Sequence, residues 1–300
     1  ISYLPAGIKY LDLIWHPMRT SVAFHFKLCQ HAPKVFLEHL KMTLGRLDMS
    51  SQDFLNIEQL DDGVLHLELK NAPVNALTAT SLRRLGKLFL ELGSDPNVAV
   101  VLLSSGLKVF SAGLNLKDAQ NYDIKEQSDI VDAFHQCFLE LYGFPKPLIC
   151  AVEGAAIAGG LFPVLCSDYR IAGAKAAFGL AEVRVGVGFP VGLVEIVRAE
   201  VRQNAMRRMM QNGQPIDVEA AKEAGIIDEQ VPHGEALEQA MKIALDYARL
   251  PPKAYKTVKH QVRMPVMNAL AREVEKASLR TAPQAWFTEE TTKAMATMIG

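Results

Sequence analysis

Two buried strands joined by a turn of small residues constrain the fold of this chain most strongly. Residues Pro147–Val152 form a short apolar run bounded by prolines and a glycine, which is typical of a buried strand, and Tyr169–Ala172 form a second one. Between them a turn of Gly, Ala and Ile residues spans Gly154–Gly160, and an apolar helix is predicted over Leu161–Cys166. Because glycines reach backbone conformations that other residues avoid, the chain can approach a ligand closely at this turn.

An antiparallel pair of strands is predicted earlier in the chain. Residues Phe54–Leu60 and Val64–Leu69 are expected to pair across the turn at 61–63, which has the sequence Asp-Asp-Gly. In the second strand leucines alternate with His66 and Glu68, so one face of the strand is expected to be solvated. His66 is therefore interpreted as a solvated strand residue rather than a ligand.

A helix and a further buried strand follow this pair. Thr78 is placed to cap a helix that ends at Gly93–Pro96, and its apolar stripe consists of Leu82, Leu85, Leu88, Phe89 and Leu92. The fully apolar run Val98–Leu103 indicates a strand covered on both faces. Strand, helix and strand at this spacing predict a βαβ unit and hence an α/β fold, with another helix over about Ser128–Tyr142.

Composition and charge exclude several classes of function. The 300 residues carry a formal net charge of -1, so no overall field attracts nucleic acid or an acidic membrane. No apolar run approaches the ~20 residues of a transmembrane helix. Cys150 and Cys166 lie in apolar runs without paired spacing, which favours buried free thiols in a reducing compartment. His135 and His233 have no metal-ligand spacing, so we assign no metal.

The first fifty residues differ from the rest of the chain. Between Met18 and Arg46 basic residues outnumber the one acidic residue, Glu38, and aromatic and leucine residues lie among them. This pattern is typical of an organellar targeting segment, and a loosely docked extension is the alternative. We interpret residues 1–52 as an extension, 53–245 as the core and 246–300 as a C-terminal helical region. Because the chain begins at Ile1 and stops at Gly300 within a helical pattern, we expect a fragment with a shortened last helix.

Two features could carry chemistry. A second small-residue turn, Phe110–Leu116, follows a buried strand, where α/β sheets commonly bind ligands, and an ordinary loop is the alternative. Glu182 is the one acidic residue between Asp168 and Glu195. A carboxylate in so apolar a neighbourhood is either a solvated residue at a strand end or a buried group with a raised pKa and a catalytic role.

Three motifs in order resemble one enzyme family. The sequences FSAGLNL, AxxGxxxAGG and FGLAE are similar to those of the enoyl-CoA hydratase/isomerase (crotonase) family, and within it to the mitochondrial Δ3,Δ2-enoyl-CoA isomerase branch. The likeness continues through Gln214–Asp228 and covers Phe54 to about Ile299. It implies a spiral of ββα units with a C-terminal helical region that packs in homotrimers. It also implies acyl-CoA as the substrate, with no separate cofactor because coenzyme A is part of that substrate.

The resemblance implies roles for residues of the two turns. Family members stabilise an enolate with two backbone N–H groups, which by position fall on Leu114 and Gly159. Asn115 departs from the more usual acidic residue, which weakens a charge-based contact there but leaves the amide donor. The residues implied to bind the substrate are Ala112, Gly113, Leu114, Asn115, Leu116, Gly159, Phe162 and Ala181.

The carboxylates decide which reaction the resemblance implies. Hydratases of the family use two glutamates; one matches Glu182, and the other falls at Phe162, which cannot transfer a proton. One glutamate suits a 1,3-proton shuttle, in which Glu182 takes a proton from C2 of a 3-enoyl-CoA and returns it at C4. Phe162 is expected to keep water out, and the acyl chain is expected to contact an apolar wall formed by Val183, Val185, Val187, Phe189 and Pro190.

We therefore expect an isomerase that forms 2-trans-enoyl-CoA in the β-oxidation of unsaturated fatty acids, located in the mitochondrial matrix. The alternatives are a hydratase or a thioester hydrolase of the same fold and a non-catalytic acyl-CoA-binding protein, with a peroxisomal or cytoplasmic location left open. No nucleic acid partner is expected.

Other charged residues are interpreted as structural. Arg207 and Arg208 lie on a helix predicted over about Val197–Gln211 and do not indicate a nucleic-acid patch. Asp168 is interpreted as a structural residue at a helix end. A solvated helix face is predicted for four cations, with contact to CoA phosphates as the alternative: Lys253, Lys256, Lys259 and Arg263.

Overall fold

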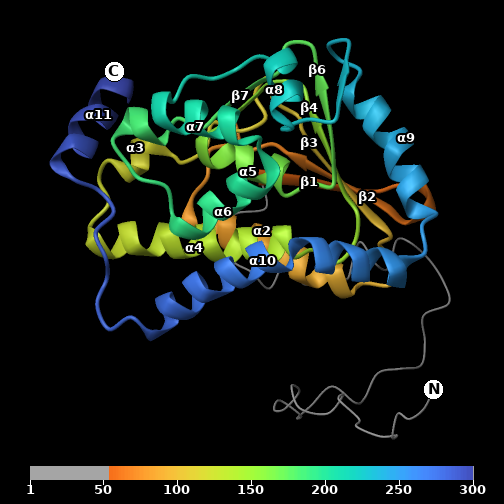
Figure 1. Cartoon of the computed structure of the whole chain (residues 1–300), viewed down its shortest axis with the longest axis horizontal. Helices are drawn as coiled ribbons and strands as arrows, with labels where there is room; N and C mark the ends of the chain where they lie inside the picture. Colours follow the sequence, from red (N-terminus) through yellow and green to blue (C-terminus); the bar gives the residue numbers. More distant parts are fainter. Residues whose placement is uncertain (1–53, 300) are drawn as a thin grey trace, which may run out of the picture. The chain divides into compact units, whose positions relative to one another are not determined.

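A six-stranded sheet organises the fold (Figure 1). The computed structural model describes residues 54–299, so the predicted extension lies outside the described residues. β1 pairs antiparallel with β2, and every other neighbouring pair of this sheet is parallel, which confirms the predicted α/β class. The strands, in the order of the sheet, are β1 (Leu55–Gln59), β2 (Val64–Leu69), β3 (Val100–Ser105), β4 (Leu148–Val152), β6 (Tyr169–Gly173) and β8 (Glu229–Val231). A separate pair of parallel strands consists of β5 (Ala155–Ile157) and β7 (Ala177–Gly179).

Helices connect these strands and follow them. Thr78 begins α2 with a capping box that includes Ser81, as its position predicts. Asp123 forms the same motif with Glu126, so α4 starts four residues before the predicted Ser128. The α-helices are α2 (Ala79–Ser94), α3 (Leu116–Ala119), α4 (Ile124–Tyr142), α5 (Phe162–Leu165), α6 (Val191–Glu200), α7 (Gln203–Asn212), α8 (Val218–Ala224), α9 (Ala236–Ala248), α10 (Pro252–Leu279) and α11 (Glu289–Ile299). Short 3-10 turns span Asp61–Gly63, Ala158–Leu161 and Glu182–Val185.

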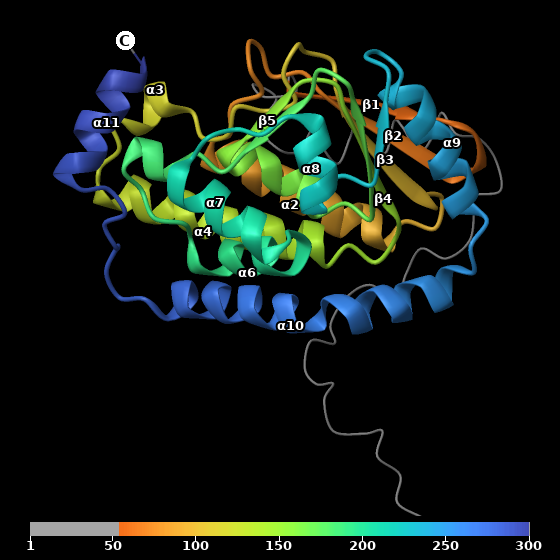
Figure 2. The same cartoon turned by 45° about the horizontal axis from the view of Figure 1, so that its top comes forward.

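Both faces of the sheet are covered. Helix α9 packs on one face through Ala236, Ala240 and Ala244, whose four-residue spacing brings them to one side of the helix. Because these side chains are small, the helix lies close to β3, β4 and β6. Leu65 and Leu103 point to the opposite face of the sheet from α9, and both are fully buried, so that face is covered as well. Figure 2 shows α2 and α4 away from α9.

The prediction that one face of β2 is solvated is wrong. His66 is only 7% exposed, and its Nε2 lies 2.8 Å from the Ser104 hydroxyl on β3. Burial lowers the pKa of His66, which favours the neutral imidazole. The alternation of leucines with polar residues correctly predicted which side chains share a face, but it could not predict that a neighbouring strand supplies a partner for a buried histidine.

Two predicted helices have different bounds in the structure. The helix expected over about Val197–Gln211 is two helices, because Val201 between α6 and α7 is extended and buried. The helix expected over Leu161–Cys166 consists of a 3-10 turn that continues into α5. Cys150 and Cys166 are buried free thiols, as predicted. Within residues 54–299, no helix combines the length and the apolar character needed to cross a membrane.

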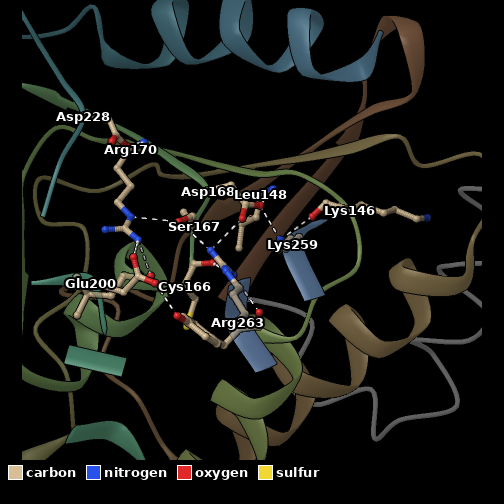
Figure 3. A network of polar contacts seen from close by, with 12 residues as sticks. Lys146, Leu148, Cys166, Ser167, Asp168, Arg170, Glu200, Asp228, Lys259 and Arg263 are labelled. Atoms are coloured by element: carbon tan, nitrogen blue, oxygen red, sulfur yellow. Dashed lines mark hydrogen bonds and ion pairs between the residues drawn. The ribbon is translucent and has the colours of Figure 1, made fainter. Parts of the chain in front are cut away.

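The prediction that Lys259 and Arg263 are solvated is also wrong. Asp168 lies between them, with its carboxylate 2.6 Å from Lys259 Nζ and 2.9 Å from Arg263 Nη2 (Figure 3). The Lys259 and Arg263 side chains are each only 7% exposed, whereas Lys253 and Lys256 are exposed as expected. The four-residue spacing places both buried cations on the same side of α10.

Backbone groups complete this buried cluster. Asp168 accepts a hydrogen bond from the Leu148 N–H at 2.8 Å, and Lys259 donates to the Lys146 carbonyl at 2.8 Å. Arg263 donates to the Cys166 carbonyl at 2.8 Å. The cluster therefore joins α10 to the beginning of β4 and to the end of α5, and Figure 2 shows α10 running alongside α4 and α6.

We predict that Asp168→Ala lowers the free energy of unfolding by about 3–5 kcal/mol, because it leaves two buried cations without their carboxylate. Urea denaturation measures the change. The matched control is Asp129→Ala, which breaks an exposed ion pair with Arg83 and is expected to lower the free energy of unfolding by less than ~1 kcal/mol. Equal small losses for both variants would contradict the structural role of Asp168.

Candidate active site

The two small-residue turns predicted to bind a ligand lie side by side. They follow β3 and β4, whose parallel pairing brings the ends of both strands to one edge of the sheet. The Ser111 N–H donates to the Ala155 carbonyl at 3.1 Å, and the Ile157 N–H donates to the Ser111 carbonyl at 2.9 Å. The first turn also contacts the loop before α2, because the Ala112 N–H donates to the Val74 carbonyl at 3.0 Å.

Each turn contains a residue in the left-handed region of backbone conformation. Gly113 has a φ of 81°, and a side chain there would place its Cβ only 2.8 Å from the Ile157 carbonyl oxygen. Ala158 has a φ of 52°, although it is not a glycine. For a residue other than glycine, such as Ala158, this conformation has a free-energy cost of about 1–3 kcal/mol and occurs preferentially at functional sites. Gly113 and Ala158 directly precede Leu114 and Gly159, the two predicted amide donors.

The N–H groups of Leu114 and Gly159 are available for a ligand. Among the turn and loop hydrogen bonds of the described residues, the Leu114 N–H is not a donor. Gly159 is the second residue of the 3-10 turn Ala158–Leu161, and the first N–H groups of a helical turn have no acceptor within it. Leu77 bonds to both neighbours of Leu114: its N–H donates to the Gly113 carbonyl at 2.8 Å, and its carbonyl accepts from the Asn115 N–H at 3.0 Å. Since successive backbone groups alternate in direction, the Leu114 N–H points away from Leu77.

A cavity of about 90 Å³ lies against both turns. Six residues predicted for the site line it: Ala112, Leu114, Leu116, Gly159, Ala181 and Glu182. Three residues of the predicted apolar wall also line it: Val185, Val187 and Pro190. The other lining residues are apolar: Phe134, Ile157, Ala158, Leu193, Trp286, Met295 and Met298. Glu182 is thus the one ionisable residue among those that line this cavity in the described part of the chain.

Glu182 begins the 3-10 turn after β7, and the surrounding apolar groups exclude water from it. Glu182 is 7% exposed, and its Oε2 has no hydrogen-bond partner among the described residues. Burial raises the pKa of Glu182 to about 8, because a charge in this cavity loses its hydration. The alternative of a solvated carboxylate at a strand end is therefore excluded. A carboxyl group with this pKa can accept and return a proton near neutral pH.

Some predicted site residues lie outside the cavity wall. Phe162 is fully buried in the core against the Phe138 ring, at 5.3 Å between ring centroids, and does not line the cavity. Asn115 is the N-cap residue of α3, and its side chain accepts a hydrogen bond from the Asp118 N–H. Asparagine is one of the preferred residues at this position, so Asn115 has a structural function here. Val183 and Phe189, expected in the apolar wall, do not line the cavity, and Val183 is 46% exposed. Gly113, expected to bind the substrate, does not line it either.

The wall contributed by the C-terminal segment was not predicted. Trp286, Met295 and Met298 come from the segment around α11, which stands beside α3 in Figures 1 and 2. Gln127 on α4 holds this segment, since its Oε1 accepts from the backbone N–H of Trp286 at 3.0 Å and of Phe287 at 2.9 Å. These residues follow no motif, so no local signal in the sequence could have found them.

No group of three or more His, Cys, Asp and Glu residues in the described part of the chain is arranged to hold a metal ion. The chemistry that the residues present can perform is proton transfer by Glu182 beside two backbone donors.

Comparisons with known proteins point to one enzyme family. Residues 59–295 match the family described as enoyl-CoA hydratase/isomerase. A probable mitochondrial enoyl-CoA hydratase 2 of Arabidopsis thaliana is 28% identical over 235 residues, covering 76% of this chain and 78% of the relative. The 2,3-dehydroadipyl-CoA hydratase of Escherichia coli K12 is 29% identical over 189 residues, covering 63% and 73%.

A solved structure shows the same fold. The human mitochondrial Δ3,Δ2-enoyl-CoA isomerase superimposes with a TM-score of 0.72 at 24% identity, covering 82% of this chain and 97% of the human one. The family expected from the three motifs is thereby confirmed, together with the crotonase-like fold and its C-terminal helices. The chain belongs to the enoyl-CoA hydratase/isomerase family.

Proposed function

We propose that this member of the family is a Δ3,Δ2-enoyl-CoA isomerase of fatty acid oxidation. The observation that carries the proposal is the cavity with one carboxyl group, Glu182, and two available backbone N–H donors. Isomerisation moves a proton within one molecule, so a single group that takes and returns the proton is sufficient. Hydration also requires a bound water and a group that activates it.

The proposed reaction begins when the thioester carbonyl oxygen accepts hydrogen bonds from the N–H groups of Leu114 and Gly159. The Glu182 carboxylate removes a proton from C2 of the 3-enoyl-CoA, and the electron pair moves onto the carbonyl oxygen to give a dienolate. Glu182 then returns the same proton to C4, and the double bond lies between C2 and C3. The two N–H donors stabilise the negative charge, and loss of one such donor typically slows a reaction by ~10²–10³.

A hydratase is the second candidate, because relatives such as the Arabidopsis thaliana protein are named hydratases. A bound water needs two to four polar partners. In the described structure Glu182 is the one carboxyl group that lines the cavity, and the residue at the position of a second glutamate, Phe162, is packed in the core. This arrangement supports isomerisation over hydration.

We extend the proposal to a homotrimer in the mitochondrial matrix. The support for assembly is an exposed apolar stripe on α10, where Val258 and Val262 are 58% and 74% exposed. The support for the location is the basic, acid-poor composition of residues 1–52.

We expect the protein to convert 3-hexenoyl-CoA to 2-trans-hexenoyl-CoA and to leave 2-hexenoyl-CoA without added water at C3. Turnover of both thioesters in deuterated water, followed by mass spectrometry, distinguishes the two reactions. Hydration of the 2-enoyl-CoA would support the hydratase instead. Thioester binding with neither reaction would indicate a non-catalytic acyl-CoA-binding protein, and release of free CoA would indicate a thioester hydrolase.

We predict that Glu182→Gln lowers kcat by about 10²–10⁴, because the amide cannot accept the C2 proton. Substrate affinity should change little, since the side chain keeps its size and loses no hydrogen bond to another residue. The matched control is Glu195→Gln, the same change on helix α6, where the carboxylate pairs with Arg198. If kcat were unchanged in Glu182→Gln, Glu182 would not be the catalytic group.

We predict that kcat/KM increases with pH and levels off above a pH of about 8. Glu182 must be ionised to take the proton, and its pKa in the free enzyme is raised to about 8 by burial. A pH profile of kcat/KM measures this value, with circular dichroism at each pH to confirm that the protein stays folded. An inflection near the ordinary carboxyl pKa of 4.5 would contradict the proposed environment of Glu182.

A further inference from the structure

A second pocket lies behind the wall of the Glu182 cavity. It has a volume of about 280 Å³ and is formed by α4, the loop before α6, α10 and the segment before α11. Pro190 and Trp286 line both spaces, so they form the partition between them. The apolar residues that line the second pocket include Phe189, Val191 and Ala285. Polar and charged residues line it too: Ser128, Asp132, His135, Glu273, Lys276, Arg280 and Gln284.

Trp286 is held firmly in this partition. Its backbone N–H donates to Gln127 Oε1 at 3.0 Å, and its indole Nε1–H donates to the Gly188 carbonyl at 2.9 Å. Its ring packs edge-to-face on Phe134, with the centroids 6.4 Å apart. Contacts on the backbone, on the indole nitrogen and on the ring face therefore fix the position of the side chain.

The sizes of the two spaces differ enough to affect which acyl chain fits. The Glu182 cavity, at about 90 Å³, has about a third of the volume of the second pocket, at about 280 Å³, so it accommodates a shorter stretch of acyl chain. The second pocket, of about 280 Å³, has room for a further stretch of chain, but Trp286 separates it from the cavity.

We infer that Trp286 is a specificity-determining residue that restricts the substrate to short-chain enoyl-CoA thioesters. This inference rests on the proposed function, which places the acyl chain in the Glu182 cavity. Replacing the indole with a small side chain would join the cavity to the second pocket and admit longer chains. Each methylene that becomes buried in the joined space should strengthen binding by about fourfold.

The test measures binding as well as turnover. Isothermal titration calorimetry gives the Kd of hexanoyl-CoA and decanoyl-CoA, which are saturated and cannot isomerise, for the wild type and for Trp286→Ala. We expect the wild type to prefer hexanoyl-CoA, and Trp286→Ala to change the ratio of the two affinities by at least tenfold in favour of decanoyl-CoA. The values of kcat/KM for 3-hexenoyl-CoA and 3-decenoyl-CoA should change in the same direction.

Phe287→Ala is the matched control. Phe287 is the next residue, is held by the same Gln127 oxygen and packs on Trp286 at 5.3 Å between ring centroids, but it lines neither space. Its removal should leave the chain-length ratio unchanged. Trp286→Phe, which keeps an aromatic ring in the partition, should retain the preference for hexanoyl-CoA.

A wild type that binds decanoyl-CoA as tightly as hexanoyl-CoA would overturn the inference, as would equal changes in Trp286→Ala and Phe287→Ala. If Trp286→Ala does not fold, Trp286→Leu serves in its place, with the same direction expected. Failure of the proposed function is distinguishable. In that case the wild type would not isomerise either 3-enoyl-CoA, whereas a changed ratio of saturated thioester affinities would still support the role of Trp286 in chain length.

Discussion

The buried contact of Asp168 with Lys259 and Arg263 fixes the position of α10 and of the segment that follows it. It binds α10 to the sheet and to α5, and α10 leads directly into the segment that carries Trp286 and α11. The part of the Glu182 cavity wall that Trp286 and α11 contribute therefore depends on charged side chains that are buried elsewhere in the fold. A buried ion pair is often no more stabilising than an apolar contact, but it tolerates few alternative partners. The contact thus fixes where α10 lies.

Exclusion of water has two effects at the candidate site. It raises the pKa of Glu182 toward neutral pH, and it strengthens any hydrogen bond made by the available N–H groups, because electrostatic interactions are stronger where the dielectric constant is low. The left-handed conformations of Gly113 and Ala158 turn the chain just before each donor. The backbone provides the donors and one side chain provides the acid–base group, so the remaining wall can be apolar.

Local patterns predicted β1, β2, β3, β4 and β6, the helix cap at Thr78, the two small-residue turns and Glu182, because each depends on residues close in sequence. The short strands β5, β7 and β8 were not predicted, and β5 lies within the second of those turns. Long-range contacts decided the rest. The spacing of Lys259 and Arg263 indicated one helix face, but only Asp168, 91 residues before Lys259, determines that the face is buried. Gln127 and Trp286 are 159 residues apart, and their contact follows from how α4 and the C-terminal segment pack. Phe162 was expected beside the substrate because it falls at the position of the family's second glutamate, but its side chain packs in the core against Phe138.

The burial of Glu182 also makes the stability of the folded protein depend on pH. Its pKa in the folded protein, about 8, lies above the ordinary value of 4.5, so the folded state binds this proton more tightly than the unfolded state does. The resulting stabilisation is complete below a pH of about 4.5 and is lost as the pH rises through about 8. The ionised carboxylate that the proposed reaction needs is thus the form that favours folding least. Between these two values, resistance to unfolding and readiness for proton transfer change in opposite directions, so the best buffer for keeping the protein is not the best buffer for assaying it.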